Sequence, residues 1–277
     1  YFRDIHLPSV VRAGRVPMKP PVRGGESRSS RLRRQVLSPE RHLAAFDLEN
    51  TLIASNVVAS FAWLASRRLD RRDRVRLVAQ TLAEAPTLLA LDRRDRSDFL
   101  RHFYRRYEGA PVDQIAEDSA EQFSDLILSK AFPAGIRRVR EHRALGHRTV
   151  LITGALDFVV EPLRPLFDDI VCASLGVDGN AYNGRLRTVP PTGEARFQAL
   201  SDYADQHGID LRESVAYADS ASDLPMLEAV GFPVAVNPEV RLASIARKRG
   251  WLVEDFAKAA GMRNRLLPLA PTGAHTS

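Results

Sequence analysis

The sequence predicts an α/β protein with a doubly wound, Rossmann-like parallel sheet and an inserted α-helical cap domain. Short apolar segments of strand length alternate with segments of helical period over most of the chain, a pattern typical of a parallel sheet covered by helices. Residues 55–130 have helical period throughout, although a single crossover between strands needs far fewer residues. We therefore expect a core at 41–54 and 131–260, with the cap at 55–130 between them.

The first predicted strand ends in acidic residues. The apolar run that starts at residue 43 leads into Asp47 and Glu49, and open α/β sheets bind ligands at the carboxyl ends of their strands. Residues i and i+2 of a strand point to the same side, so both carboxylates can address one ligand. Such a pair indicates a divalent metal site, or a nucleophile beside a general acid. The alternative is a strand that ends in a polar turn, where Asp and Asn are common.

The segment 55–130 predicts a bundle of helices. Val57, Phe61 and Leu64 recur at the spacing of one helix face, and Pro86 and Pro111 are expected to mark breaks between helices. The arginine, histidine and aromatic residues of 99–107 could line a substrate cavity. We favour the alternative, in which their apolar faces are buried within the bundle and the arginines lie in solvent.

Helices and strands alternate again after the cap. Helices are predicted at 136–146, at 157–167 with an interruption near Pro162, at 195–207, and in a segment that ends at residue 250. Strands are predicted at 148–152, 170–173, 214–218 and 233–236, with hairpin-forming Asp-Gly and Asn-Gly pairs within 178–184. Together with the first strand, these give five short strands with helical connections.

Three later segments supply groups that phosphoryl transfer at Asp47 would need. Thr153 and Gly154 follow an apolar strand and offer a hydroxyl and an amide to a phosphate oxygen. Arg196 offers a fixed cation near the start of a predicted helix. The acidic segment 219–223 follows another apolar strand and has an aspartate at each end.

The order and spacing of these segments resemble the haloacid dehalogenase (HAD) superfamily, and most closely its subfamily IB of phosphoserine-phosphatase-like hydrolases with a helical C1-type cap. The resemblance extends from about residue 43 to residue 251. It implies a Mg²⁺-dependent hydrolase that cleaves a small-molecule phosphomonoester through an aspartyl-phosphate intermediate. It also implies that the chain is part of a larger fused bacterial protein with a covalently linked upstream domain.

The resemblance also implies roles for individual residues. Asp47 is the expected nucleophile, and Glu49 the expected general acid and base. The expected phosphate-binding groups are Thr153, the amide of Gly154, and Arg196. The expected Mg²⁺ ligands are all oxygen atoms, as this ion prefers, and come from Asp47, the backbone carbonyl of Glu49, Asp219 and Asp223.

The chain departs from the family pattern at four positions. Glu49 stands where the family's phosphatases have an aspartate, Arg196 replaces their lysine, and Ala218 replaces a common glycine. Asn56 occupies the position of the glutamate that binds the substrate amine in phosphoserine phosphatases, so we expect a substrate other than phosphoserine. Two functional classes stay open: a phosphatase, or a catalytically degenerate domain that serves as an interaction or regulatory module of a multidomain enzyme, for example one of lipid metabolism.

The basic character of the chain is confined to its start. Residues 1–40 carry the whole formal net charge of +6, because acidic and basic side chains are equal in number from residue 41 onward. This argues against nucleic-acid binding. The segment 1–40 is rich in Pro, Gly, Ser and Arg and is predicted to be a linker or disordered arm, and the chain is expected to continue upstream of Tyr1. Residues 261–277 are expected to form a tail.

Cysteine content and hydropathy indicate the compartment. Cys172 is the single cysteine and lies in an apolar predicted strand, so we expect a buried thiol without a catalytic role. No apolar run approaches the roughly 20 residues of a transmembrane helix. We therefore expect a cytoplasmic protein without a transmembrane segment.

Overall fold

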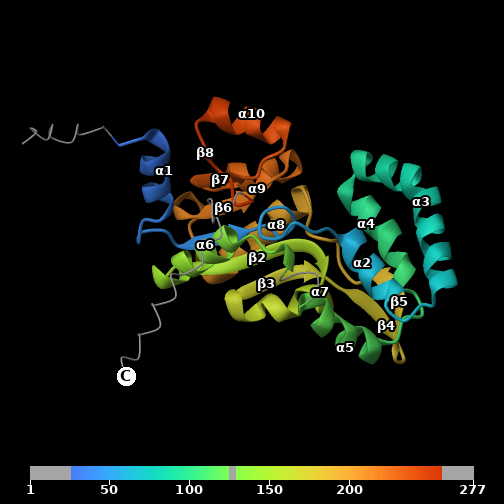
Figure 1. The fold of residues 1–277 in the computed structure, drawn as a ribbon. Coiled ribbons are helices and arrows are strands. Elements are labelled where there is room, and N and C mark those ends of the chain that lie inside the picture. The colour runs from blue at the N-terminus through green and yellow to red at the C-terminus, as the bar shows by residue number, and fades with distance from the viewer. Residues whose placement is uncertain (1–25, 125–128, 258–277) are drawn as a thin grey trace, which may run out of the picture.

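The computed structural model describes residues 26–124 and 129–257 (Figure 1). Its main sheet has six parallel strands in the order β3-β2-β1-β6-β7-β8. These strands are β1 (Leu43–Phe46), β2 (Arg148–Leu156), β3 (Asp169–Ala173), β6 (Val215–Ala218), β7 (Phe232–Val236) and β8 (Leu252–Glu254). The predicted parallel α/β sheet is confirmed. The prediction of five strands is wrong, because β8 has only three residues and carries no pattern that marks it as a strand.

Alternate residues of the strands face two separate hydrophobic cores. Phe46 and Tyr217 lie in one core with their rings stacked at a centroid distance of 4.5 Å, while Ala45 and Ala216 belong to the other. The first core is covered by α6 (Pro133–Ala144), α7 (Asp157–Val160) and the inserted helices. The second core is covered by α8 (Glu194–His207), α9 (Leu224–Ala229) and α10 (Val240–Arg249). Helices therefore cover both faces, as expected for a doubly wound sheet.

The helical insertion lies between β1 and β2 and stands to one side of the sheet in Figure 1. It contains α2 (Val57–Ser66), α3 (Arg71–Arg94), α4 (Arg96–Tyr104), the 3-10 helix η1 (Arg105–Tyr107) and α5 (Val112–Gln122). The predicted break at Pro86 is wrong, because α3 continues through it. Proline removes the hydrogen bond to the carbonyl of Leu82, and Leu82 is 67% exposed, so solvent can hydrate that carbonyl. The predicted limits of the cap, 55–130, stay a prediction.

A two-stranded hairpin joins the insertion to the core. It consists of β4 (Leu175–Asp178) and β5 (Ala181–Leu186) and lies where the sequence predicts it. The backbone of Tyr182 accepts a hydrogen bond from the amide of Gly109 at 2.8 Å and donates one to the carbonyl of Ala110 at 2.9 Å. The large side chains Phe99, Phe103, Tyr104 and Tyr107 are buried in the first core. The preferred interpretation of these aromatic residues is therefore confirmed.

Part of the predicted arm is a helix. α1 (Arg28–Val36) begins after Ser27, whose hydroxyl accepts a hydrogen bond from the amide of Ser30, and it packs beside β8. Arg33 forms a 2.7 Å ion pair with Glu254. The helix has one buried residue, Val36, and Leu32 packs beside it against the first core, which is too short an apolar pattern to predict the helix. Residues 1–25 of the predicted arm and the predicted tail 261–277 lie outside the described residues.

Short 3-10 helices form several of the remaining connections. They are η3 (Glu161–Leu166), η4 (Leu211–Glu213) and η5 (Ala221–Asp223). The first of these follows α7 and interrupts the predicted helix near Pro162, as expected.

Cys172, the single cysteine, is partly buried. It packs against the first core, and burial raises the pKa of its thiol to about 11. A thiol with such a pKa is protonated and a poor nucleophile. Within the described part of the chain, no helix combines the length and hydropathy needed to cross a bilayer.

Candidate active site

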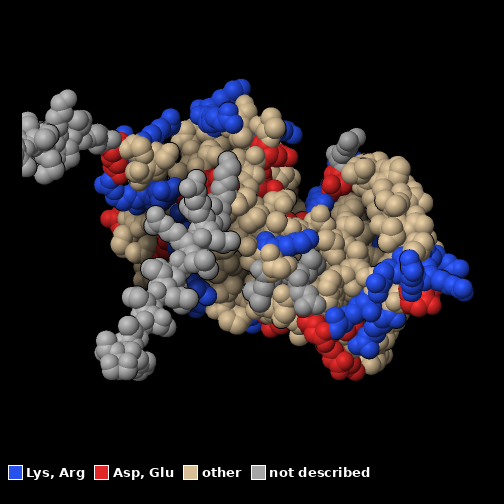
Figure 2. Space-filling model, in the orientation of Figure 1, with Lys and Arg blue, Asp and Glu red and all other residues tan. Residues whose placement is uncertain are grey.

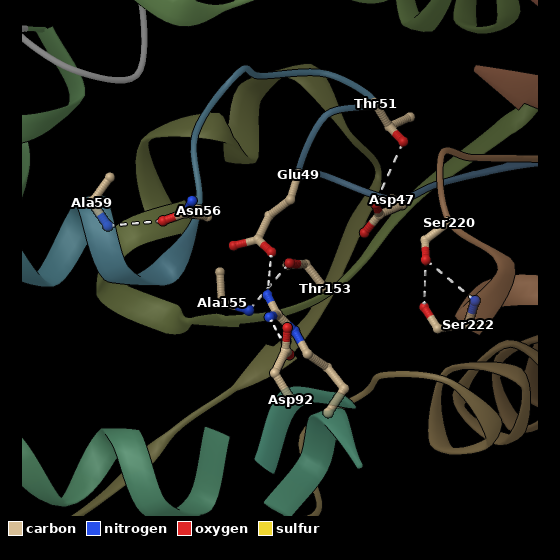
Figure 3. A network of polar contacts seen from close by, with 12 residues as sticks. Asp47, Glu49, Thr51, Asn56, Ala59, Asp92, Thr153, Ala155, Ser220 and Ser222 are labelled. Carbon is tan, nitrogen blue, oxygen red and sulfur yellow. Dashed lines mark hydrogen bonds and ion pairs between the residues drawn. The ribbon is translucent and has the colours of Figure 1, made fainter. Parts of the chain in front are cut away.

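Asp47 directly follows β1, at the point where the strand order reverses between β1 and β6. Such switch points are where open α/β sheets bind ligands. The side chain of Asp47 is buried, its amide donates to the carbonyl of Tyr217 at 2.9 Å, and its Oδ2 accepts from the hydroxyl of Thr51 at 3.4 Å (Figure 3). Leu48 points into the first core, whereas Glu49 lines the same cavity as Asp47. The expectation that both carboxylates address one site is therefore met.

Three aspartates from two neighbouring loops converge in this cavity. Asp47, Asp219 and Asp223 each place one carboxylate oxygen within 4.8 Å of the others. Arg196, from the first turn of α8, lies among them with its Nη2 at 2.7 Å from Asp47 Oδ1 and its Nη1 at 2.6 Å from Asp223 Oδ1. The structure thus brings these four predicted site residues together.

Burial and mutual repulsion disfavour ionisation of the three aspartates. Burial and then the negative charges of Asp47 and Asp223 raise the pKa of Asp219 to about 8. Burial also raises the pKa of Asp223 to about 6, although Arg196 acts against the rise. Burial raises the pKa of Asp47 as well, and the charge of Arg196 again opposes the rise. The cluster therefore requires a further cation if all three carboxylates are to be charged at neutral pH.

The cluster fits a divalent metal ion. Three carboxylates face the single guanidinium of Arg196, which leaves two negative charges uncompensated when all three are ionised. Asp47 Oδ1 is buried and makes no hydrogen bond of acceptable geometry to a described residue, despite its close approach to Arg196. Oxygen donors without histidine or cysteine suit Mg²⁺ better than Zn²⁺.

Glu49 is held by a residue from the insertion. Its Oε2 accepts a 2.7 Å hydrogen bond from Nη2 of Arg96, whose Nη1 donates to Oδ1 of Asp92 at 2.7 Å. Figure 3 shows Glu49 and Asp92 facing each other from β1's loop and the insertion. Burial raises the pKa of Glu49, and Arg96 opposes this rise. The sequence analysis missed Arg96, because its contact joins residues 47 positions apart and follows from no local pattern.

The cavity lies between the core and the insertion, with a volume of about 310 Å³. Figure 2 shows a notch in the molecular surface at this place. Gly154 lines the cavity, and a Cβ at this position would lie 2.7 Å from both Leu100 Cδ1 and Thr192 Cγ2. Thr153 is buried beside it, with its Oγ1 accepting a hydrogen bond from the amide of Ala155 at 3.1 Å. The prediction that Thr153 and Gly154 follow the strand is wrong, because β2 continues through both residues to Leu156. The phosphate-binding roles of Thr153, Gly154 and Arg196 stay predictions.

Asn56 caps a helix, a structural role that is separate from the substrate contact expected for it. Its Oδ1 accepts a 2.9 Å hydrogen bond from the amide of Ala59, so it is the N-cap of α2. Its side chain also lines a narrow pocket of about 10 Å³ between Glu49 and Tyr104. The predicted contact of Asn56 with substrate stays a prediction.

Residues after β7 fix the acidic loops and were not predicted. Asn237 donates from Nδ2 to the carbonyl of Asn50 at 2.6 Å, and Glu239 accepts a 2.8 Å hydrogen bond from the amide of Ala221. The backbone amide of Glu239 also donates to the carbonyl of Asp219 at 3.0 Å. Asn50 and Asn237 both have positive φ, which asparagine tolerates better than most residues. The Asn-Pro pair at 237–238 was a sequence signal for this turn, but not for its contact with the site.

Comparison with known proteins identifies the family. The model of the haloacid dehalogenase-like hydrolase family matches residues 44–228, which include Asp47, Thr153, Arg196 and both aspartates of the segment 219–223. The chain belongs to this family. The resemblance inferred from the spacing of these residues is therefore confirmed at the level of the family.

Several relatives of this haloacid dehalogenase-like hydrolase are phosphatases by name. The inhibition of morphological differentiation protein of Streptomyces azureus is 30% identical, over 82% of each chain. The histidinol-phosphatase of Neisseria meningitidis is 28% identical, over 78% of this chain and 99% of the relative. A phosphoserine phosphatase of Mycobacterium tuberculosis is 29% identical, over 77% of this chain and 70% of the relative. The chain is thus a phosphatase-type hydrolase by its relatives, which do not determine its substrate.

Solved structures support the same fold. A protein of unknown function from Bordetella pertussis matches with a TM-score of 0.68 and 25% identity, over 78% of this chain and 99% of that chain. The apo form of a phosphoserine phosphatase matches with a TM-score of 0.56 and 17% identity, over 78% and 94% of the two chains. This hydrolase therefore shares the phosphoserine-phosphatase-like fold over most of its length. The expected fusion to a larger protein gains no support from these comparisons.

Proposed function

We propose that the protein is a Mg²⁺-dependent phosphatase that hydrolyses a small phosphomonoester through an aspartyl-phosphate on Asp47. The observation that supports this most strongly is the charge of the site, where three carboxylates, two of them buried and one partly buried, face one guanidinium. This arrangement favours a divalent cation and, once one is bound, can accept the negative charge of a phosphoryl group. We propose that the ion is held by Asp47, Asp219, Asp223 and the backbone carbonyl of Glu49. Bound Mg²⁺ would offset charge on the phosphoryl oxygens.

The chain's own residues divide the chemistry between them. Asp47 attacks phosphorus through a carboxylate oxygen, and the bond from phosphorus to the leaving oxygen breaks. Glu49 gives its proton to that oxygen and later removes one from the water that hydrolyses the aspartyl-phosphate. Arg196, Thr153 and the amide of Gly154 hold the phosphoryl oxygens.

Hydrolysis of 4-nitrophenyl phosphate with and without Mg²⁺ tests the proposal. We expect turnover that requires Mg²⁺ and is abolished by Asp47→Asn, because the amide is a poor nucleophile and a poor ligand. Asp205→Asn is the matched control, since this aspartate is exposed on α8 with no side-chain hydrogen bond or ion pair to a described residue. Equal turnover by wild type and Asp47→Asn would rule out the aspartyl-phosphate.

The substrate is proposed to be a phosphomonoester other than phosphoserine. The position expected to bind the substrate amine is Asn56, which carries no charge and whose oxygen caps α2. The names of two relatives of similar identity refer to different phosphomonoesters, phosphoserine and histidinol phosphate. We expect kcat/KM for L-phosphoserine to fall below that of the best substrate in a phosphomonoester panel. A maximum at L-phosphoserine would contradict this specificity without affecting the proposed reaction.

One contact favours the alternative of a degenerate regulatory domain. Arg196 is ion-paired with Asp47 itself, and it must leave this contact or share it before the nucleophile can attack. If the domain is degenerate, the wild type should bind Mg²⁺ yet hydrolyse no member of a broad panel. Turnover above that of Asp47→Asn for any member would exclude this alternative.

A further inference from the structure

A second cavity near the active site is lined by arginines. It lies between α4, η1 and β5 with the loop that follows, and its volume is about 460 Å³. Arg101 and Arg105 come from the insertion, and Arg185 and Arg187 from the hairpin and the following loop. The other residues lining it are Gly184, Leu186, Thr188 and Val189. No described residue that lines this arginine groove carries a carboxylate, in contrast to the cavity around Asp47.

Three of the four arginines of the arginine groove have no direct ionic partner within the described structure. Arg105, Arg185 and Arg187 make no ion pair and no side-chain hydrogen bond with a described residue, and Arg101 has only Asp98 at 3.5 Å on its own helix. The neighbouring Arg106, by contrast, is ion-paired with Glu84. Because acidic and basic residues are equal in number from residue 41 onward, a general excess of basic residues does not explain this local one. The charge of Arg187 also acts on Asp157, where it opposes the rise in the pKa of that carboxyl. Four cations in one groove, three of them without a direct ionic partner, still attract anions.

Backbone packing holds the two walls of the groove together. Gly184 has a φ of 69°, and a Cβ at this position would lie 2.9 Å from the carbonyl oxygen of Arg105. The hydrogen bonds of Tyr182 to the backbone of Gly109 and Ala110 fix the same contact. The arginines of the two walls are therefore brought together by the fold.

The arginine groove is continuous with the active site. A hollow of about 410 Å³ lies between them and shares Arg101 and Val189 with the groove. The same hollow shares Arg96, Thr192 and Ser222 with the cavity around Asp47. The hollow is also lined by Asp95, Asp98 and Glu194, so a ligand that extends from Asp47 to the arginines passes beside these carboxylates.

We propose that the arginine groove is a subsite for a second phosphate group of the substrate, so that the preferred substrate is a small molecule with two separate phosphates. The proposal rests on the proposed function, because the first phosphate is the one cleaved at Asp47. Guanidinium groups bind phosphate through paired, charge-assisted hydrogen bonds, and four of them within one groove exceed what a single carboxylate needs. The subsite selects substrates and takes no part in the chemical step.

A series of alkanediol bisphosphates of increasing length, each paired with its monophosphate, tests the subsite. For at least one length we expect kcat/KM to exceed that of the monophosphate about tenfold, mainly through a lower KM. The double variant Arg185→Ala/Arg187→Ala should lose this advantage and retain wild-type turnover of the monophosphate. The length that gives the largest effect measures the span from Asp47 to the groove.

The matched control removes two arginines elsewhere. Arg241 and Arg247 are exposed on α10 and, within the described structure, have no ion pair, so Arg241→Ala/Arg247→Ala changes the net charge equally. The subsite is refuted if no bisphosphate exceeds its monophosphate, if Arg185→Ala/Arg187→Ala keeps the advantage, or if the α10 variant loses it to the same extent.

Calorimetry separates failure of the subsite from failure of the proposed function. If the wild type hydrolyses no monophosphate, the proposed function fails, and titration of the bisphosphates into wild type and Arg185→Ala/Arg187→Ala still decides the subsite. Weaker binding by the variant supports the groove as a phosphate subsite. Equal binding overturns it.

Discussion

Two arginines hold the acidic groups of the site from opposite sides. Arg196 belongs to the core, is buried, and contacts Asp47 and Asp223. Arg96 belongs to the insertion and contacts Glu49. A glutamate has one more rotatable bond than the aspartate usual in the family, so its carboxylate needs an added constraint to stay in one position. Arg96 supplies that constraint only while α4 is in place over the core.

Replacement of Arg96 should therefore impair the acid role of Glu49. We expect Arg96→Ala to lower kcat about tenfold or more for an alkyl phosphate, a modest part of what general acid catalysis contributes. The loss should be much smaller for 4-nitrophenyl phosphate, whose leaving group needs little protonation. Arg94→Ala is the matched control, because Arg94 is exposed and without an ion pair among the described residues.

A double-mutant cycle shows whether Arg96 acts through Glu49. In a Glu49→Gln background, Arg96→Ala should cause no further loss of kcat, since the contact it would remove no longer holds a functional acid. Independent, multiplicative losses would mean that Arg96 contacts the substrate or the phosphoryl group itself. Steady-state kinetics of the four proteins decides between these results.

Metal binding should depend on pH because the ligands hold protons. The pKa of Asp219 is about 8, above its usual value of 3.8, so in the metal-free protein this group stabilises the fold at low pH and loses that effect as pH rises through about 8. Mg²⁺ competes with these protons. The rise in Tm caused by Mg²⁺ should therefore be small at about pH 5 and grow between about pH 6 and pH 8.

Thermal denaturation at each pH, with and without Mg²⁺, measures this linkage. Asp219→Asn should lose most of the Mg²⁺-dependent rise in Tm, whereas Asp205→Asn on the exposed face of α8 should keep it. An equal response of wild type and Asp219→Asn at all pH values would exclude the proposed metal site.

At the scale of elements, α4 and β2 meet at Gly154. The hydroxyl of Tyr104 donates a 2.8 Å hydrogen bond to the carbonyl of Gly154, and Leu100 from the same helix leaves no room for a side chain there. The end of β2, which is expected to bind phosphate, is therefore also the place where the insertion docks. The docking of the insertion and the proposed phosphate site therefore share this glycine.

Gly154→Ala should displace α4 from β2. A methyl group 2.7 Å from Leu100 Cδ1 and Thr192 Cγ2 cannot be accommodated without movement. We expect faster hydrogen exchange of the amides in α4, unchanged exchange in α10 as the internal control, and a fall in kcat/KM. Wild-type exchange in α4 would show that the core, not the insertion, absorbs the added group.

In the elements that the sequence predicted correctly, the local pattern of apolar residues matches the residues that the fold buries. The strands that deliver Asp47 and Asp219 are apolar because both of their faces are buried, and this pattern is visible in the sequence. The helix α1 and the strand β8 were missed because each contributes few apolar residues to the core and a charged contact joins them. Pro86 was misjudged because the exposed side of a helix tolerates a lost hydrogen bond.

Prediction of the site from sequence has the same limit, because it finds residues placed by periodic elements and misses those placed by tertiary packing. Asp47 and the segment 219–223 follow strands, Thr153 lies within β2, and Arg196 is in the first turn of α8. The positions of these residues are therefore fixed by periodic elements. Arg96 reaches Glu49 only through the packing of the insertion on the core, which depends on contacts such as that of Leu100 with Gly154. No pattern along the chain encodes that relative position.

At the scale of the whole molecule, a buried polar network connects α1, near the start of the described chain, with β8, near its end. Arg138 of α6 binds both carboxylate oxygens of Glu254 in β8, at 2.6 and 3.0 Å, and Arg33 of α1 contacts the same carboxylate. Tyr217 in the middle of the sheet lies 3.3 Å from Arg138 and 2.6 Å from His142. Burial lowers the pKa of His142 to about 2, so this histidine is neutral. The charge of the network is that of the arginines, Glu254 and Glu141, which pairs with Arg138 at 2.9 Å.

Removal of the carboxylate at Glu254 should destabilise the fold without altering the active site. Glu254→Gln removes the carboxylate that pairs with the buried guanidinium of Arg138 and leaves only the partly exposed Glu141 as its counter-charge. Breaking a buried pair typically costs about 3–5 kcal/mol, and we expect a loss at the lower end of this range. For a domain of this size the Tm should fall by about 6 °C or more. Glu228→Gln removes an exposed pair with Arg249 and should change Tm little. The Mg²⁺-dependent rise in Tm should persist in Glu254→Gln, because the network shares no residue with the acidic cluster. Loss of that rise would show that α1 and β8 are coupled to the metal site.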